Sequence, residues 1–334
     1  MSQHPYFTIA IPTYNRAAFL REAINSALSQ TDSDFELLIS DNASTDDTPA
    51  LIASIKDKRL RYTRQPVNFG SLNNCTFLLR ETRGRFFILH QDDDLLHPEF
   101  LSRCRQAVGE QTDVSLFATA VYSGSKPEGV LGETIYLRDP PWFPASHLQK
   151  ATEISGVDAA IMQLFSLPFV CPGVAFDTEC LRKTGGFFSE FGYAGDNITL
   201  ARIALCGKVL YDPRVGAFLR IHKSNFSGQI SLDKIFACRR EADRIIIGYL
   251  DAAAPDWPDR ARICLNHLSK RRRGKFLAEA WKNNYPGLLK QLVAESIVGK
   301  SSIKKFGVHL FAIFLKGKFF RVVKSHFRPG KPSN

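Results

Sequence analysis

The stretch Arg85–Leu96, RFFILHQDDDLL, decides the fold. Its apolar strand pattern stops at three consecutive aspartates, Asp92, Asp93 and Asp94, and Pro98 follows closely as a helix-start signal. Adjacent carboxylates repel one another, so a fold that holds three of them at a strand end normally needs a cation there. Oxygen-only ligands indicate Mg²⁺ or Mn²⁺, and Mg²⁺ is typically held by one or two carboxylates plus substrate phosphates. The run also fits a solvated acidic turn, and the neighbouring motifs favour a metal–diphosphate site instead.

Length and composition indicate a soluble globular chain. With 334 residues, 44% of them hydrophobic, it can bury a sizeable core. The seven cysteines are odd in number and scattered without a Cys-x-x-Cys pair, which is typical of reduced thiols in a cytosolic protein without a zinc site or disulfide framework. The first residues, MSQHPYFTIAIPTYN, contain neither a basic segment nor a long apolar one, so we expect no signal peptide and a cytoplasmic location.

Charge divides the chain into two regions. Residues 1–230 carry 22 Lys and Arg against 25 Asp and Glu, whereas residues 231–334 carry 22 against 8. The net charge of +11 therefore comes from the C-terminal third. This asymmetry predicts two modules with separate roles: one with an acidic site first, and one that faces an anionic surface second.

The first 230 residues alternate strand-like and helix-like patterns, as a layered, mostly parallel α/β sheet requires. We expect strands at 7–11, 35–39, 60–64 and 86–89, and helices at 17–29 and 71–82. Another helix is expected to begin at an N-cap within 44–48 and to run through Ile55. Three polar segments then follow the carboxyl ends of strands: Pro12–Arg16, Asp41–Asp47 and Gln91–Leu96. In open α/β sheets this edge is where ligands bind.

These segments have suitable chemistry for a nucleoside diphosphate. Asp41 and Asn42 can hydrogen-bond a base edge, while Thr13, Tyr14 and Asn15 offer polar contacts beside a helix N-terminus that favours anions. Each segment alone is also an ordinary turn, and their coincidence favours a binding site. The chain contains no Gly-x-Gly-x-x-Gly sequence and no P-loop, which argues against a dinucleotide enzyme or a kinase.

As an ordered set, the motifs resemble those of family 2 inverting glycosyltransferases with the GT-A fold, of the bacterial surface-polysaccharide type. The first block comprises Pro12 to Arg16, Ser40 to Asp46, Asn68, Gly70, Asn74, Gly84 to Phe86 and Gln91 to Leu95. The second block comprises Gly185 to Phe187, Asp196, Arg202, Gly207, Arg220 to His222, Asn225 and Ser227. The likeness covers roughly residues 5–228 and implies a catalytic domain at 1–228, followed by a helical, basic region at 229–334.

The resemblance implies roles for these residues. A UDP-sugar donor would bind at Pro12, Thr13, Tyr14, Asn15, Asp41, Asn68, Gly70, Asn74, Asp92, Asp93 and His222. Within this set Asp41 would contact the base and Asp92 the ribose. The metal, Mg²⁺ or Mn²⁺, would be held by Asp94, Asp92 and His222, with Asp93 as the alternative to Asp94. Asp196 would be the general base that removes a proton from the acceptor hydroxyl, and a single displacement would invert the anomeric centre.

Two of these residues have simpler interpretations. Asp196 precedes a helical run at 198–205, so it is also a candidate N-cap, and Gly195 stands where many relatives have an acidic residue. Glu190 is the alternative base. His222 also fits a surface histidine that follows a strand.

The basic C-terminal region interleaves charge with bulky apolar residues. Residues 296–334 carry nine Lys and Arg and no acid, and the longest uncharged stretch, Phe306–Leu315, is too short for a membrane-crossing helix of about 20 residues. The pattern fits amphipathic helices that lie on an anionic membrane through residues 296–328, and it fits packing against the catalytic domain nearly as well. Membrane contact would suit a glycan or lipid-linked acceptor and a peripheral location at the inner face of the membrane.

Two other functions fit parts of the sequence. A nucleotidyltransferase on a similar fold would need a basic, glycine-rich phosphate loop, which Pro12–Arg16 does not provide. A nucleic-acid-binding protein would use the basic C-terminal region, but its interleaved phenylalanines and aliphatic residues indicate a membrane or core surface, and no nucleic-acid-binding motif is present. We therefore expect no nucleic acid partner.

Overall fold

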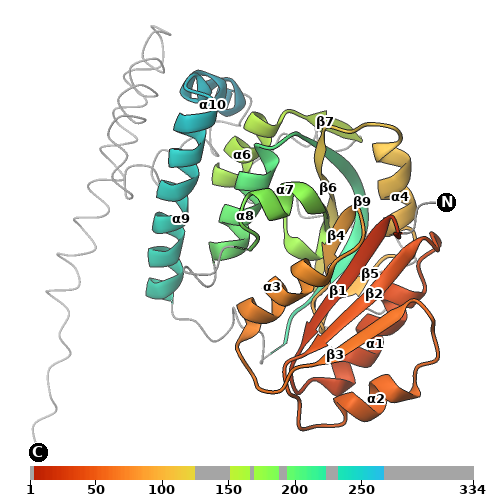
Figure 1. The fold of residues 1–334 in the computed structure, drawn as a ribbon. Coiled ribbons are helices and arrows are strands. Elements are labelled where there is room, and N and C mark those ends of the chain that lie inside the picture. The colour runs from red at the N-terminus through yellow and green to blue at the C-terminus, as the bar shows by residue number, and fades with distance from the viewer. Residues whose placement is uncertain (1–3, 125–150, 166–168, 188–193, 223–231, 267–334) are drawn as a thin grey trace, which may run out of the picture. The chain divides into compact units, whose positions relative to one another are not determined.

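The computed structural model describes residues 4–124, 151–165, 169–187, 194–222 and 232–266. These residues form one mixed sheet with helices on both faces (Figure 1). The strands are β1 (Phe7–Thr13), β2 (Phe35–Asp41), β3 (Leu60–Arg64), β4 (Phe86–Leu89), β5 (Leu95–Leu96), β6 (Val114–Gly124), β7 (Thr152–Ile154), β8 (Val174–Asp177) and β9 (Lys208–Arg220). The helices are α1 (Ala17–Leu28), α2 (Thr48–Ser54), α3 (Ser71–Glu81), α4 (Phe100–Val108), α6 (Gly156–Phe165), α7 (Thr178–Lys183), α8 (Gly195–Ala204), α9 (Leu232–Ala253) and α10 (Trp257–Asn266), with a 3₁₀ turn, η1 (Cys171–Gly173).

The N-terminal half of the sheet is parallel, in the order β3-β2-β1-β4. Its connecting helices α1 and α2 lie on one face and α3 on the other (Figure 1). Every residue of β1 and β2 is buried, as expected for parallel strands covered on both sides. The expected strands and helices of this half are confirmed, and β1 and β2 each extend two residues further, to Thr13 and Asp41.

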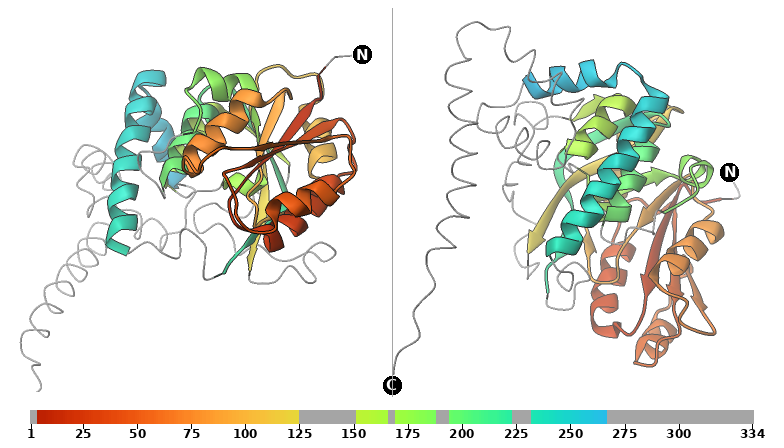
Figure 2. Two further views of the ribbon diagram at one scale, coloured as in Figure 1. Left: turned by 60° about the horizontal axis from the view of Figure 1, so that its bottom comes forward. Right: turned by 90° about the vertical axis from the view of Figure 1, so that its left-hand side faces the viewer.

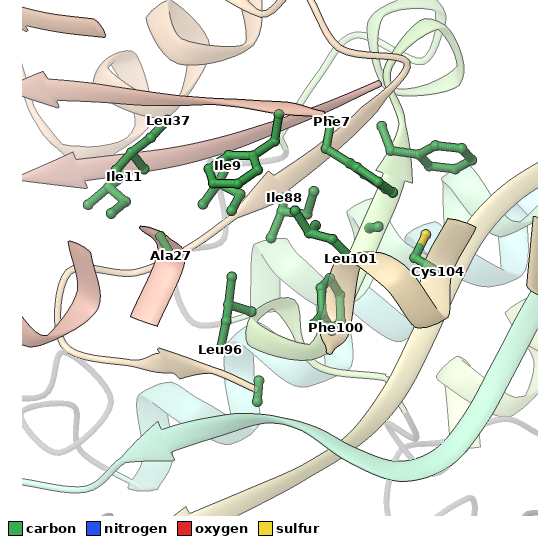
Figure 3. Packing of buried hydrophobic residues seen from close by; sticks show 14 of the residues in the cluster. Phe7, Ile9, Ile11, Ala27, Leu37, Ile88, Leu96, Phe100, Leu101 and Cys104 are labelled. Carbon is green, nitrogen blue, oxygen red and sulfur yellow. The ribbon is translucent and has the colours of Figure 1, made fainter. Parts of the chain in front are cut away.

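The main hydrophobic core lies between the sheet and α1, α2 and α4. Alternate residues of β1 point into it, Phe7, Ile9 and Ile11, and α4 contributes Phe100 and neighbours at helical spacing (Figure 3). These side chains are fully buried. Since burying a large apolar side chain stabilises a fold by about 1.5–3 kcal/mol, this layer holds the parallel strands, and hence their polar carboxyl ends, in place.

The C-terminal half of the sheet continues with antiparallel β8, then β6 and β9, which run parallel to each other. The two-residue strand β5 pairs with the far end of β9, with Leu95 opposite Phe218 and Leu96 opposite Ala217. This pairing brings the residues just before β5, the three aspartates, beside Arg220, the last residue of β9.

Helices α9 and α10 pack beside α6 and α8 (Figure 2). The apolar side chains of Ala242, Ile246, Leu250 and Trp257 are buried there. Residues Met1–Arg273 form one compact unit, and Gly274–Asn334, including the predicted membrane segment 296–328, lies outside the described residues. The division at 228/229 stays a prediction. In the described part of the chain, no helix combines the length and the apolar character needed to cross a bilayer.

Candidate active site

The carboxyl ends of β1, β2 and β4 meet at one edge of the sheet, as predicted. Thr13 pairs with Asp41 as the last residues of β1 and β2. The Thr13 hydroxyl also donates a 2.8 Å hydrogen bond to Asp92 Oδ2 in the loop after β4. The three predicted segments are therefore in direct contact.

The loops after β1 and β2 are tied to each other. The backbone N–H of Asn15 donates to Ser44 Oγ (2.9 Å), and Asn15 Oδ1 accepts from the N–H of Thr45 (2.7 Å). Asn15 and Ala43 have positive φ angles of 53° and 65°. Non-glycine residues adopt this conformation at a cost of about 1–2 kcal/mol, and strain of this kind clusters at binding sites.

Asp41, the predicted base-binding residue, is fully buried. Its carboxylate accepts 2.8 Å hydrogen bonds from the Tyr62 hydroxyl and the Ser44 backbone N–H, and Arg64 Nε lies 3.8 Å away. Burial and the bond to Asp41 both raise the pKa of Tyr62, so the phenol stays a hydrogen-bond donor. Asp41 is thus rigidly oriented.

The asparagines have two different structural roles. Asn42 Nδ2 donates to Asn68 Oδ1 (2.7 Å), which also accepts from the N–H of Gly70 and so shapes the loop before α3. Asn74 is buried, and its amide exchanges hydrogen bonds with the hydroxyl and carbonyl of Ser40. Asn74 thereby ties α3 to β2. Tyr14, in contrast, has an exposed side chain (43%).

Asp92 and Asp93 share a cation, Arg16. Its Nη1 lies 2.6 Å from Asp93 Oδ2 and 3.3 Å from Asp92 Oδ1. Burial raises the pKa of Asp92 to about 6, although Arg16 and the Thr13 hydrogen bond favour the charged form. His222 Nε2 lies 3.0 Å from the same Asp93 oxygen, and its ring stacks on Phe19 with centroids 4.7 Å apart. His222 therefore lies beside Asp93, and its role at the metal or the donor diphosphate stays a prediction.

Asp94 is the most deeply buried of the three, with no exposed surface. Its Oδ1 accepts the backbone N–H of Arg220 (2.9 Å), whereas Oδ2 is buried without a hydrogen-bond partner. Burial, followed by the charge of Asp93, raises the pKa of Asp94 to about 8. The side chain of Arg220 donates to the Asp93 carbonyl (2.9 Å) and pairs with Glu22 (2.8 Å), which locks the aspartate loop against the end of β9.

The donor set partly fits a divalent cation. Among the described residues, no three His, Cys, Asp or Glu side chains converge as a ready-made metal site. Mg²⁺ at phosphate sites, however, needs only one or two carboxylates, because substrate oxygens and water complete its shell. The unpartnered Asp94 Oδ2 is the kind of buried oxygen that such a cation would satisfy.

Asp196 is the second residue of α8, and Ala194 is the N-cap, with no side-chain cap bond. The N-cap interpretation of Asp196 is therefore wrong: the helix begins three residues before the predicted apolar run, so this carboxyl lies inside the first turn. Its side chain is exposed, yet the surrounding protein desolvates it and raises its pKa, while a hydrogen bond with Cys171 favours the charged form. Glu190 lies outside the described residues.

Cys171 lies in η1 beside Asp196 and is buried. Burial raises the pKa of its thiol, and the charge of Asp196 and a hydrogen bond with Asp196 add to this effect, with a smaller effect from the charge of Asp94.

Sequence reasoning gave no role to Arg16 or Arg220. Both belong to the quoted motifs, but Arg16 lies 76 positions before Asp92, so no local pattern signalled their contact. The contact of Arg220 with Asp94 joins residues 126 positions apart and follows from the β5–β9 pairing.

Comparisons with known proteins agree with this geometry. The family described as Glycosyl transferase family 2 matches residues 8–167. A GalNAc(5)-diNAcBac-PP-undecaprenol beta-1,3-glucosyltransferase of Campylobacter jejuni is 32% identical over 75% of this chain and 73% of its own length. The succinoglycan biosynthesis protein ExoO of Rhizobium meliloti is 27% identical over 70% of this chain and 66% of its own. The chain spans less than two thirds of the length of ExoO and of some Rickettsia relatives.

Solved structures share the fold. TarS 1-349 of S. aureus in complex with UDP has a TM-score of 0.58 at 17% identity, covering 79% of this chain and 71% of that one. The mannosyltransferase PcManGT of Pyrobaculum calidifontis, in complex with GDP-Man and Mn2+, has a TM-score of 0.51 at 17% identity, covering 93% and 85%. The sheet order and the site define a glycosyltransferase of the GT-A fold. The chain belongs to glycosyltransferase family 2.

Proposed function

We propose that this protein is a metal-dependent inverting glycosyltransferase. It moves a sugar from a nucleotide-diphosphate donor, a UDP-sugar, to a glycan or lipid-linked acceptor in surface polysaccharide synthesis. The observation that carries the proposal is the contact of the three polar segments at one sheet edge, where Thr13 bonds to Asp92 and Asp94 has a buried oxygen without a hydrogen-bond partner. The UDP complex of TarS and the names of the two relatives support the donor and acceptor classes.

The donor lies along the carboxyl edge of the sheet in this proposal. Asp41 and the loops around Thr13 and Asn68 hold the nucleoside, and Asp92 faces the ribose. Asp94, with Asp92 and His222 nearby, holds Mg²⁺ or Mn²⁺, which when bound stabilises the charge of the departing nucleoside diphosphate. The tight support of Asp94 by Arg220 favours this role, because a ligand that is held in place loses little freedom on binding.

Asp196 is the general base. Its exposure leaves it open to an acceptor hydroxyl, and a raised pKa makes a carboxylate a better proton acceptor. Removing that proton as the hydroxyl oxygen attacks the anomeric carbon yields one displacement and inversion. The membrane contact through residues 296–328 and a peripheral cytoplasmic location stay predictions.

The test is a thermal-shift screen of nucleoside diphosphates and nucleotide sugars, with and without Mn²⁺ or Mg²⁺. We expect one nucleotide to stabilise the wild-type protein in a metal-dependent way, and Asp94→Ala to abolish that shift. Asp196→Asn should keep the donor shift and lower the turnover number by about a thousandfold. Asp177→Asn, which retains an N-cap side chain on α7, is the matched control and should behave as wild type. Absence of any nucleotide shift, or full turnover by Asp196→Asn, would contradict the proposal.

A further inference from the structure

Two cysteines that the proposed reaction does not use lie side by side. Cys180 belongs to α7, and Cys206 lies two residues past the end of α8. Their thiols hydrogen-bond each other. Cys206 is exposed and Cys180 is partly buried, so a reagent in solution reaches the pair through Cys206. Two thiols in contact, one of them open to solvent, can close into a disulfide.

The surroundings of Cys206 favour its thiolate. The hydrogen bond from Cys180 and the positive charges of Arg202 and Lys183 outweigh the effect of burial, and they lower the pKa of Cys206 to about 7. A thiol with a pKa near the ambient pH combines a large thiolate fraction with good nucleophilicity. Cys206 is therefore the sulfur of this pair that attacks first.

Cys180 has the opposite surroundings. Its hydrogen bond to Cys206, burial and the negative charge of Asp177 all raise the pKa of its thiol. Its backbone is held at both polar groups: the N–H donates to Asp177 Oδ1 (2.9 Å) at the start of α7, and the carbonyl accepts from the Thr184 hydroxyl (2.9 Å). Cys180 therefore stays protonated until Cys206 has reacted, and it then lies next to the sulfur that it would attack.

We propose that Cys180 and Cys206 form a redox-modification site that reacts with small-molecule disulfides of the glutathione class. The Cys206 thiolate attacks one sulfur of the reagent, the reagent's S–S bond breaks, and its other sulfur leaves as a thiolate that takes a proton from solvent. Cys180 then releases its proton to solvent and attacks Cys206 Sγ, which expels the second reagent thiolate. The reagent is reduced to two thiols, and the protein gains one disulfide. Because Asp196 lies between the two cysteines in the sequence, this disulfide closes a loop that contains the proposed base.

The experiment incubates the native full-length protein with oxidised glutathione at pH 7. Acid quenching, alkylation of the remaining thiols and peptide mass spectrometry then map the disulfides. We expect a disulfide between Cys180 and Cys206 as the main product. In Cys180→Ser the reaction should stop at a mixed disulfide of Cys206 with glutathione. In Cys206→Ser the Cys180 thiol should be consumed at least about tenfold more slowly, because a thiol with a raised pKa forms little thiolate.

The matched control is Cys238→Ser, which removes another partly buried cysteine, on α9, and should oxidise as wild type does. The wild-type map needs no variant, so it decides the question even if a serine variant does not fold. A different cysteine pairing as the main product, no disulfide at all, or an unchanged rate in Cys206→Ser would overturn the inference. The nucleotide screen uses reduced protein, so a failure there leaves this inference standing.

Discussion

At the scale of single residues, the acidic run is flanked by a histidine that must stay neutral. His90 directly follows β4 and has no exposed surface. Its Nε2 lies 3.3 Å from the Ala23 carbonyl and from Ser26 Oγ, while Nδ1 has no partner. Burial lowers the pKa of His90 to about 4, despite the opposing effects of the Ala23 contact and the charge of Asp93.

This depressed pKa predicts a pH dependence of stability. Between pH 6.5 and 4 the unfolded chain binds a proton at His90 that the folded protein does not, so the contribution of His90 to stability falls as the pH is lowered through this window. Asp92 and Asp94 act in the opposite direction, because their raised pKa values favour proton binding by the folded protein. From pH 7 to pH 5 wild type should therefore lose about 2 kcal/mol of stability relative to His90→Gln, in which the His90 contribution is absent. Urea unfolding of both proteins at both pH values measures this difference. His4→Gln, at an exposed position, should change with pH as wild type does, and the same pH dependence in His90→Gln and wild type would rule out this cause.

At the scale of elements, the close approach of β1 and β4 depends on a glycine. A Cβ on Gly84 would lie 2.5 Å from both the Phe7 carbonyl carbon and the Thr8 nitrogen. The Gly84 N–H also donates to Thr8 Oγ1 (2.9 Å), and its carbonyl accepts from Thr178. Backbone atoms cannot yield as a flexible side chain can, so any side chain at position 84 must push the strands apart.

We therefore expect Gly84→Ala to destabilise the protein by about 2–4 kcal/mol, because it displaces a central strand pair of the sheet. Gly248→Ala is the control, since this exposed position in the middle of α9 has nothing within 4 Å of an added Cβ. It should stabilise by about 0.5–1 kcal/mol through the helix propensity of alanine. Chemical unfolding gives the free energy of unfolding of both variants and of wild type. If Gly84→Ala changed it as little as Gly248→Ala does, the strands would tolerate a side chain at position 84.

At the scale of the whole molecule, the compact unit continues past residue 228, where the motif resemblance ends, to Arg273. Helices α9 and α10 cover α6 and α8, and they bury Ile246, Leu250 and Trp257. At about 2 kcal/mol for each large side chain, this layer contributes an amount comparable with the net stability of a typical domain, about 5–15 kcal/mol.

Two shortened chains test whether the cooperative folding unit ends at Gly228 or at Arg273. A chain that ends at Arg273 keeps every contact of the compact unit and should melt cooperatively within about 4 °C of the full-length protein, a change of less than about 1 kcal/mol. A chain that ends at Gly228 exposes the apolar faces of α6 and α8 and should lack a cooperative transition. Differential scanning calorimetry of both chains gives the answer. A cooperative transition in the shorter chain would favour the predicted division at 228/229.

The sequence by itself determined the alternation of strands and helices, the mostly parallel half of the sheet and the family. These rest on local patterns: Phe7–Ile11 is apolar at strand length, and 17–29 has helical spacing. It also indicated that Thr13, Asp41 and Asp92 share one edge, because parallel strands end together. Their direct contact follows from that rule.

Only the tertiary structure decided which groups face one another within that edge. The pairing of β5 with β9 places Arg220 and His222 at the aspartates, and the tertiary fold brings Cys171 of η1 to Asp196 of α8. Local periodicity carries no information on such long-range contacts. Burial, which raises the pKa of Asp94 and leaves one of its oxygens unpartnered, is likewise a property of the assembled core.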